Sequence, residues 1–294
     1  MMDQEPNRLL SISVAPTAEA NLEKILAYLR YLAEEEPTLD FEAKRAAGCV
    51  IIGSNEEAQL EIVIERLKRA CDAEAVIGAP EVALLETISK EVEHTYTHRV
   101  RSAGSSQFAD LTMIIAPTGP GGGCSFESRI VGSAVPTEYI GGIEKGVQSV
   151  MASGPLGGAA LIDIKVVLTD AKFRQPESSA LAFEIAARTA FREGILKAGA
   201  KIMEPIMKVD VVMRGAYISD LNSRRGKVLG QNKRGGSIGI DAVVPLVNML
   251  GYAASLHRMS SAGAHFSMQF DHYAVLPSND DPDGNFAPAI GLRA

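Results

Sequence analysis

The spacing of apolar residues near the N-terminus constrains the fold more than any other feature of the sequence. They occupy one face at i, i+3, i+4 and i+7 spacing: Leu22, Ile25, Leu26, Leu29, Leu32 and Ala33. This is the buried stripe of an amphipathic helix, which must pack against a sheet or another helix. Residues 11–15, just before the stripe, have Ile12 and Val14 on one face, as a half-buried strand does.

Further signals extend this pattern to a strand–helix–strand–helix–strand order. Thr17 is expected to cap the first helix, and Pro37 is expected to end it. Short apolar strands at 49–52 and 74–77 flank a second helix, which Asn55 is expected to cap. We therefore predict a small α/β sandwich for the first domain.

The pattern changes at residue 84. The next region is predicted to contain long strands at 86–98 and 108–116, a polar loop at 99–106, a glycine-rich turn at 117–123, a helix at 136–153, a strand at 161–169 and a long helix capped by Ser178 and Ser179.

From residue 205 the first pattern returns loosely. Its predicted elements are a strand at 206–213, a short helix at 218–225, hairpin strands at 227–230 and 240–244, a helix at 252–259 and a strand at 265–270. The tail after Pro277 has loop composition and is expected to be flexible. The predicted domains are therefore residues 1–83, 84–204 and 205–294.

Composition limits the class of protein. The 294 residues suit two or three domains, and 46% apolar with 22% charged residues are typical of a globular chain. The start lacks a secretory signal, no window has the apolar length of a membrane span, and the three cysteines form no C-x-x-C pair. A reducing cytoplasm is expected. The net charge of −7 excludes a globally basic nucleic-acid binder.

Catalytic motifs are weak. No phosphate-binding G-x-x-x-x-G-K-[ST] segment occurs, and the glycines at 119–123 are expected to form a hairpin turn. Gly235–Gly239 matches the G-x-S-x-G nucleophile elbow around Ser237, with Asp271 and His272 downstream, but no strand precedes it and no helix follows it. A serine hydrolase stays a remote alternative, and we expect no cofactor, metal site or catalytic residue.

One charge feature points to nucleic acid. Seven basic and only two acidic side chains lie between Lys208 and Arg234. In an acidic chain this reversal favours contact with phosphates, although a solvated surface is the alternative. Smaller basic groups lie at 99–101 and 172–174, in two predicted loop tips.

Read in order, the sequence resembles the C-terminal part of bacterial elongation factor G. The resemblance rests on the segments ISVAPTAEANLEK, GSNEEAQLEIVIERLKR, YTHRVRSAGSSQFA, VPTEYIGGIEKG, SGPLGG, ISDLNSRRGKVLGQ, VPLVNMLGYAASLHRMS and MQFDHY. They extend over nearly the whole chain, and the YTHRVRSAGSSQFA loop is similar to the version typical of alphaproteobacteria.

The resemblance implies a multidomain α+β fold with α/β sandwiches: a ferredoxin-like third domain, a fourth domain like domain 2 of ribosomal protein S5, and a ferredoxin-like fifth. In the family, the fourth domain enters the decoding region and contacts transfer RNA and messenger RNA during translocation. The fifth lies near ribosomal RNA of the large subunit. The family's GTPase domain and its following β-barrel are absent from this sequence, so GTP hydrolysis would need a GTPase domain in cis or in trans.

This sequence departs from the family pattern at contact segments. Ser54–Gln59 replaces the M-G-E-L-H region that faces the GTPase domain in the family. Arg174 stands where the family has a tip histidine, and Gln175 replaces an acidic residue. In the other tip loop, Ala103 and Ser106 replace two glycines.

The resemblance and the charges together give a set of expected RNA or ribosome contacts: Arg99, Arg101, Ser102, Gly104, Ser105, Gln107, Lys172, Arg174, Gln175, Glu177, Arg224, Arg225, Lys233 and Arg234. The favoured interpretation is a ribosome-binding protein of this type without catalytic residues, and the alternative is a stand-alone regulator that occupies the factor site or another RNA.

Overall fold

A computed structural model describes residues 8–36, 38–71, 75–102, 105–130, 135–213, 218–234, 237–259 and 264–277. Its contacts divide the chain into two compact units. One combines residues up to Ala83 with Glu204–Ala274, and the other contains Leu84–Met203. The expected flexible tail after Pro277 lies outside the described residues.

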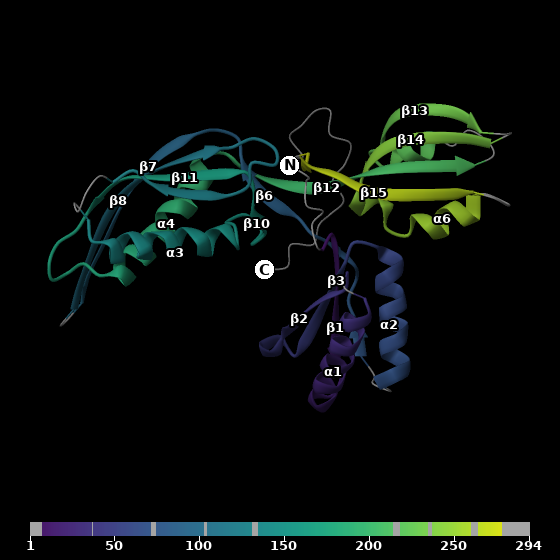
Figure 1. Ribbon diagram of the computed structural model, residues 1–294, viewed down its shortest axis with the longest axis horizontal. Coiled ribbons are helices and arrows are strands. Elements are labelled where there is room, and N and C mark those ends of the chain that lie inside the picture. Colours follow the sequence, from purple (N-terminus) through teal and green to yellow (C-terminus); the bar gives the residue numbers. More distant parts are fainter. Residues whose placement is uncertain are drawn as a thin grey trace. The chain divides into compact units, whose positions relative to one another are not determined.

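The N-terminal region is an antiparallel sheet with two helices on one face (Figure 1). Its elements are β1 (Leu10–Pro16), α1 (Glu19–Glu35), β2 (Asp40–Lys44), a 3-10 turn (Arg45–Ala47), β3 (Cys49–Ser54), α2 (Glu57–Cys71), β4 (Ala75–Ile77) and a short β5 (Glu81–Val82). The main strand order is β2-β3-β1-β4, which with this chain order is the ferredoxin-like arrangement. The predicted stripe of α1 is buried on this sheet, with Leu29 fully inaccessible.

Three local predictions for this region were wrong. Strand β2 was not predicted, because it is a charged edge strand in which only Phe41 is partly buried. The residue that precedes α1 is Ala18, not Thr17. Helix α2 begins at Glu57, so the residue that precedes it is Glu56, not Asn55. The Asn55 side-chain oxygen accepts a hydrogen bond from the Leu9 N–H at 3.0 Å and so joins two segments.

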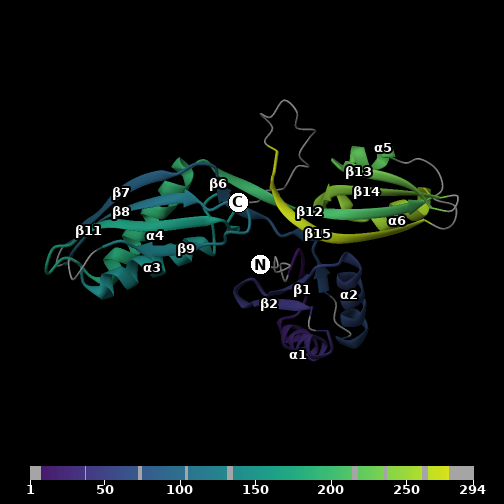
Figure 2. The ribbon, with the colours of Figure 1, turned by 45° about the horizontal axis from the view of Figure 1, so that its top comes forward.

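The second unit is a sheet with one face covered by two helices. Its elements are β6 (Leu85–Ile88), β7 (Val92–Ser102), β8 (Ser105–Pro117), β9 (Ser125–Ser128), α3 (Thr137–Met151), β10 (Ala160–Leu161), β11 (Ile164–Lys172) and α4 (Ala180–Lys197). Strands β7-β8-β11-β9 form the sheet, and Figure 2 shows α3 and α4 lying along one side of it. Ser179 caps α4 as predicted, accepting from the Ala182 N–H at 3.2 Å.

The glycine-rich segment at 119–123 is not the hairpin turn that the sequence predicted. It connects β8 to β9, and β11 lies between these two strands in the sheet. The buried carboxylate of Asp163 accepts hydrogen bonds from the N–H groups of Gly123 at 2.9 Å and Gly121 at 3.3 Å. The glycines therefore form a crossing loop that Asp163 holds.

The last region repeats the topology of the first. Its elements are β12 (Ala200–Met213), α5 (Ile218–Ser223), β13 (Lys227–Arg234), β14 (Ser237–Pro245), a 3-10 turn (Leu246–Met249), α6 (Tyr252–Met259) and β15 (His265–Val275). Strand β15 pairs with β12, which gives the order β15-β12-β14-β13. This is again the ferredoxin-like order, so the loose sequence repeat corresponds to a repeated fold.

Strand β12 begins six residues before the predicted start at residue 206. Ala200–Met203 pairs with β6, and Ile206–Met213 pairs with β14. Pro205 lies outside the residues of β12 that pair with β6 and with β14. A proline therefore lies inside this strand without breaking it.

Close packing of α3 on α4 gives a prediction about glycine. A Cβ on Gly146 would lie 2.5 Å from the Glu184 carbonyl oxygen, whereas one on Gly141 of the same helix would meet nothing within 4 Å. We expect Gly146→Ala to lower the free energy of unfolding by about 1–3 kcal/mol through overpacking. Gly141→Ala should raise it by about 0.5–1 kcal/mol. Urea unfolding of the two variants measures this, and equal effects would contradict the packing argument.

Candidate nucleic-acid interface

The hairpin of β7 and β8 presents two arginines on the sheet face opposite the helices, which we call the open face. Along β7, His94 and His98 are buried on the helix side, whereas Thr95, Thr97, Arg99 and Arg101 are exposed on the open face. The pairing runs to Ser102 opposite Ser105 at the hairpin end. Gly104 and the side chains of Ser102 and Ser105 lie outside what the structure describes.

A second loop, residues 173–179 between β11 and α4, is fastened to β8. The Ser178 hydroxyl donates to the Phe108 carbonyl oxygen at 2.6 Å and accepts from the Arg174 N–H at 2.9 Å. The Phe108 N–H donates to the Glu177 carbonyl oxygen at 3.1 Å. These bonds bring the two loop tips predicted from sequence together at one end of the sheet.

Arg174 and Arg99 converge on Phe108. The guanidinium carbon of Arg174 lies 4.3 Å from the centre of the Phe108 ring, which is a cation–π contact. Arg99 is the direct partner of Phe108 in the β7–β8 register, so both side chains start from the same face. Phe108 was not among the predicted contacts, and only its place in the strand alternation could have pointed to it.

The other predicted tip residues have mixed roles. Lys172 is exposed and lies 3.8 Å from Asp110 and 3.6 Å from Asp170, so part of its charge is compensated. Gln107 pairs with buried His98 at 3.0 Å between Oε1 and Nε2. The exposed residue Gln175 and half-buried Glu177 belong to the loop at 173–179.

Arg224, a predicted anchor, is used within the protein. Its guanidinium donates to the Asn248 carbonyl oxygen at 2.6 Å and to Asp220 at 3.3 Å, and it lies 4.8 Å from the centre of the Tyr252 ring. Burial, helped by the Asp220 charge, raises the pKa of Tyr252 to about 12. Arg224 therefore joins α5 to the segment that precedes α6.

Arg225 forms a buried ion pair with Glu204. Its side chain is 13% exposed and that of Glu204 only 2%, and both guanidinium nitrogens reach the carboxylate, one at 3.2 Å. Of the predicted anchors, Lys233 is exposed, as are nearby Lys208 and Lys227, while only the backbone of Arg234 is described. The basic segment is thus partly an internal network.

Ser237 lacks the geometry of a nucleophile elbow. It belongs to β14 and pairs with Arg234 of β13 in an antiparallel hairpin, not in a strand–turn–helix. His272 hydrogen-bonds to its neighbour Asp271 at 2.6 Å on exposed positions of β15. The hydrolase alternative therefore has no support from the geometry.

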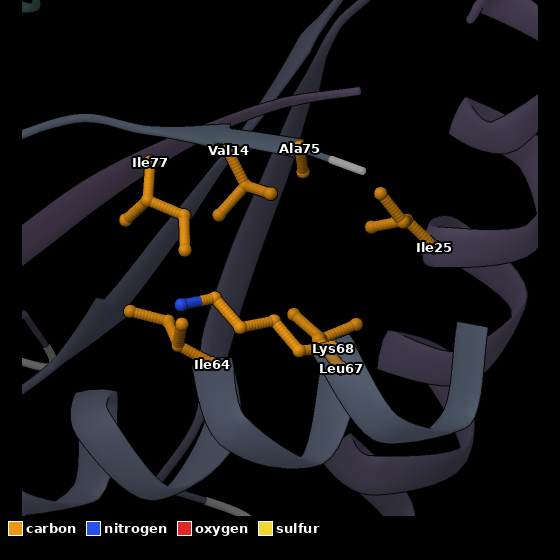
Figure 3. A pocket seen from close by; sticks show the side chains of 7 residues that line it. All are labelled: Val14, Ile25, Ile64, Leu67, Lys68, Ala75 and Ile77. Carbon is orange, nitrogen blue, oxygen red and sulfur yellow. The ribbon is translucent and has the colours of Figure 1, made fainter. Parts of the chain in front are cut away.

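Two depressions lie in the N-terminal region. The first is a small apolar pocket of about 10 Å³, room for roughly one water, and Figure 3 shows Lys68 extending along it. Its lining is Val14, Ile25, Ile64, Leu67, Lys68, Ala75 and Ile77. The second is a more open, polar depression of about 440 Å³ at the start of α2. Four residues that differ from the family pattern line it, namely Asn55, Glu56, Ala58 and Gln59, and Gln59 donates there to Thr38 and Glu36.

Within the described residues no cluster of side chains could hold a metal ion, and no helix is long and apolar enough to span a membrane. Models of three family regions match the chain: "Elongation Factor G, domain III" at residues 6–79, "Elongation factor G, domain IV" at 80–199 and "Elongation factor G C-terminus" at 201–283. This chain belongs to the elongation factor G family.

Similar proteins agree with this assignment. Elongation factor G of Ruegeria pomeroyi is 54% identical and that of Dinoroseobacter shibae 52% identical, each over 93% of this chain and 39% of the relative. A crystal structure of a Thermus thermophilus protein matches with a TM-score of 0.70 and 28% identity, over 94% of this chain and 42% of that one. The predicted family and fold class are confirmed, and the chain spans about two fifths of its relatives' length.

The buried pair predicts a large stability effect. Glu204→Ala would leave the Arg225 guanidinium without its carboxylate in a nearly inaccessible place, so we expect a loss of about 3–5 kcal/mol in the free energy of unfolding. Glu65→Ala is the matched control, because it removes an exposed pair with Arg69 that is worth no more than about 0.5 kcal/mol. Chemical denaturation measures both, and similar losses would contradict the internal role of Arg225.

Proposed function

We propose that this chain binds the ribosome in the manner of elongation factor G, with the end of the β7–β8 hairpin entering the decoding region. The observation that carries the proposal is that Arg99 and Arg101 of β7 and Arg174 of the loop at 173–179 lie at one end of the sheet, where Ser178 fastens that loop to β8. Such a rigid basic tip can contact transfer RNA, messenger RNA and ribosomal RNA. The cytoplasm, where translation takes place, is the proposed location.

The proposed mechanism is insertion by shape followed by charge-assisted contacts. Guanidinium groups donate hydrogen bonds to phosphate oxygens without reading sequence, so binding should weaken with salt. The exposed lysines Lys208, Lys227 and Lys233 would add a second contact through the C-terminal ferredoxin-like region. The chain itself supplies no chemistry in this proposal, and any GTP hydrolysis would come from a GTPase domain in cis or in trans.

A stand-alone regulator is the second candidate. Arg174 and Gln175 at the tip, and the polar depression around Gln59, differ from the family pattern at contact surfaces. A protein of this kind could occupy the factor site without supporting translocation. Ribosome binding measured with and without a separate GTPase partner distinguishes the two, because only the translocation factor gains nucleotide-dependent binding.

Reversing the charge at the tip should weaken ribosome binding. Arg174→Glu replaces a donor with an acceptor that repels phosphate, so we expect a loss of about 1–3 kcal/mol in binding free energy. Arg192→Glu is the control, because Arg192 is exposed on α4 roughly 20 Å along the helix from the tip. Sedimentation with ribosomes at low salt measures both variants. Unchanged binding of Arg174→Glu would remove the tip proposal.

The isolated chain should neither bind nor hydrolyse GTP. The sequence has no phosphate-binding loop, and the family regions matched are domain III, domain IV and the C-terminus. Titration of the protein with GTP in a calorimeter should give no saturable heat. Stoichiometric binding would show a nucleotide site that this proposal does not contain.

A further inference from the structure

Phe108 is buried on a sheet face where its neighbours are exposed on β7 and half-buried on β8. In β8, Ala109, Leu111 and Met113 point to the helices and are fully inaccessible. Phe108 has the opposite parity and therefore lies on the open face, yet it is only 6% exposed. Something on the open face must cover its ring.

The cover is the loop that carries Arg174. The guanidinium lies over the ring at 4.3 Å, and the loop's position is set by the Ser178 and Glu177 hydrogen bonds to the Phe108 backbone. Arg174 is itself exposed, and no ion pair involves it within the described part of the chain. One side of a planar cation is thus against an aromatic ring, and the rest is open to solvent.

A planar guanidinium that is held in this way can stack on a second planar group. Unpaired nucleobases stack on aromatic and arginine planes, whereas a phosphate needs only the donors at the guanidinium edge. A lysine can also bind a phosphate, as a point charge without a plane. The contact with Phe108 therefore favours a nucleobase, and not only a phosphate, as the ligand of Arg174.

The neighbouring arginines supply the matching backbone contacts. Arg99 and Arg101 lie two residues apart on the same face of β7, which places them about 6.7 Å from each other along the strand. This pair of cations beside a stacking plane fits the alternation of phosphates and bases in single-stranded RNA. Val100, the exposed apolar residue between them, has the opposite parity, so it adds no apolar anchor to the open face.

We propose that Arg174, supported by Phe108, is a stacking platform for one unpaired nucleobase of RNA, with Arg99 and Arg101 on the adjacent phosphates. This deepens the proposed function, on which it rests. It assigns Arg174 a role in binding a base, and it assigns Phe108 a positioning role behind the guanidinium.

The test compares RNA with and without bases, using the full chain. The probes are a short end-labelled oligoadenylate and an abasic ribose–phosphate chain of the same length, measured by fluorescence anisotropy. We expect the wild type to bind oligoadenylate roughly tenfold more tightly than the abasic chain. Arg174→Lys should reduce this ratio to about one while keeping the salt dependence, because the charge stays and the plane is lost. Arg192→Lys, at an exposed position of α4 away from the tip, is the control and should keep the ratio.

Phe108→Leu is a second test of the stacking proposal, because it retains apolar volume and removes the ring under the guanidinium. It should also lower the ratio, and Arg174→Lys, an exposed substitution, keeps the test decisive if Phe108→Leu unfolds. A wild-type ratio near one, or an unchanged ratio in Arg174→Lys, overturns the stacking proposal. Displacement of oligoadenylate by an equal concentration of an acidic peptide also overturns it, in favour of a protein partner.

The experiments distinguish a failure of the proposed function from a failure of the stacking proposal. If Arg174→Glu binds ribosomes like the wild type while the base preference of the isolated chain is lost in Arg174→Lys, the platform stands and its ribosomal use is excluded. If Arg174→Glu weakens ribosome binding and Arg174→Lys keeps the base preference, the tip contact stands and stacking is excluded.

Discussion

One-sided burial of the antiparallel sheets is the constraint on which the rest of this structure depends. Two helices cover one face of each main sheet, so the residues of a strand divide between a helix side and an open face. In β7 this division buries His94 and His98 and leaves Arg99 and Arg101 in solvent. The basic tip is therefore a direct result of strand alternation, and a shift of register by one residue would move the arginines to the helix side.

The hydroxyl group of Ser178 brings a further basic residue to this exposed strand face. Ser178 accepts from the backbone of Arg174 and donates to the backbone of Phe108, so it joins the loop before α4 to β8. The adjacent Ser179 caps α4, which fixes where the helix begins and the loop ends. Fastening by two neighbouring serines explains how an exposed arginine keeps a defined place over a ring.

Prediction from sequence succeeded where one local signal decided the outcome. The bounds of α6 and the cap of α4 follow from apolar spacing and a serine pair, and the family resemblance gave the fold class of the regions. Prediction failed where a residue or strand distant in the sequence determines the local structure. β2 is a strand only because β3 pairs with it. In the candidate site the arginines were predicted from the sequence, but Phe108 could be identified only from the β7–β8 register in the structure.

Counting basic residues in the sequence has the same limit as a way to predict phosphate contacts. A run of basic residues predicts phosphate contact only if the cations are free, and the carboxylate that engages Arg225 is Glu204, twenty-one residues earlier in sequence. Because a buried charge without a partner costs several kcal/mol, Arg225 stays engaged with Glu204 inside the protein. Arg224 is likewise engaged by Asn248 and Asp220. Among the described side chains of the basic segment, the exposed Lys208, Lys227 and Lys233 are therefore the ones that we propose for RNA contact.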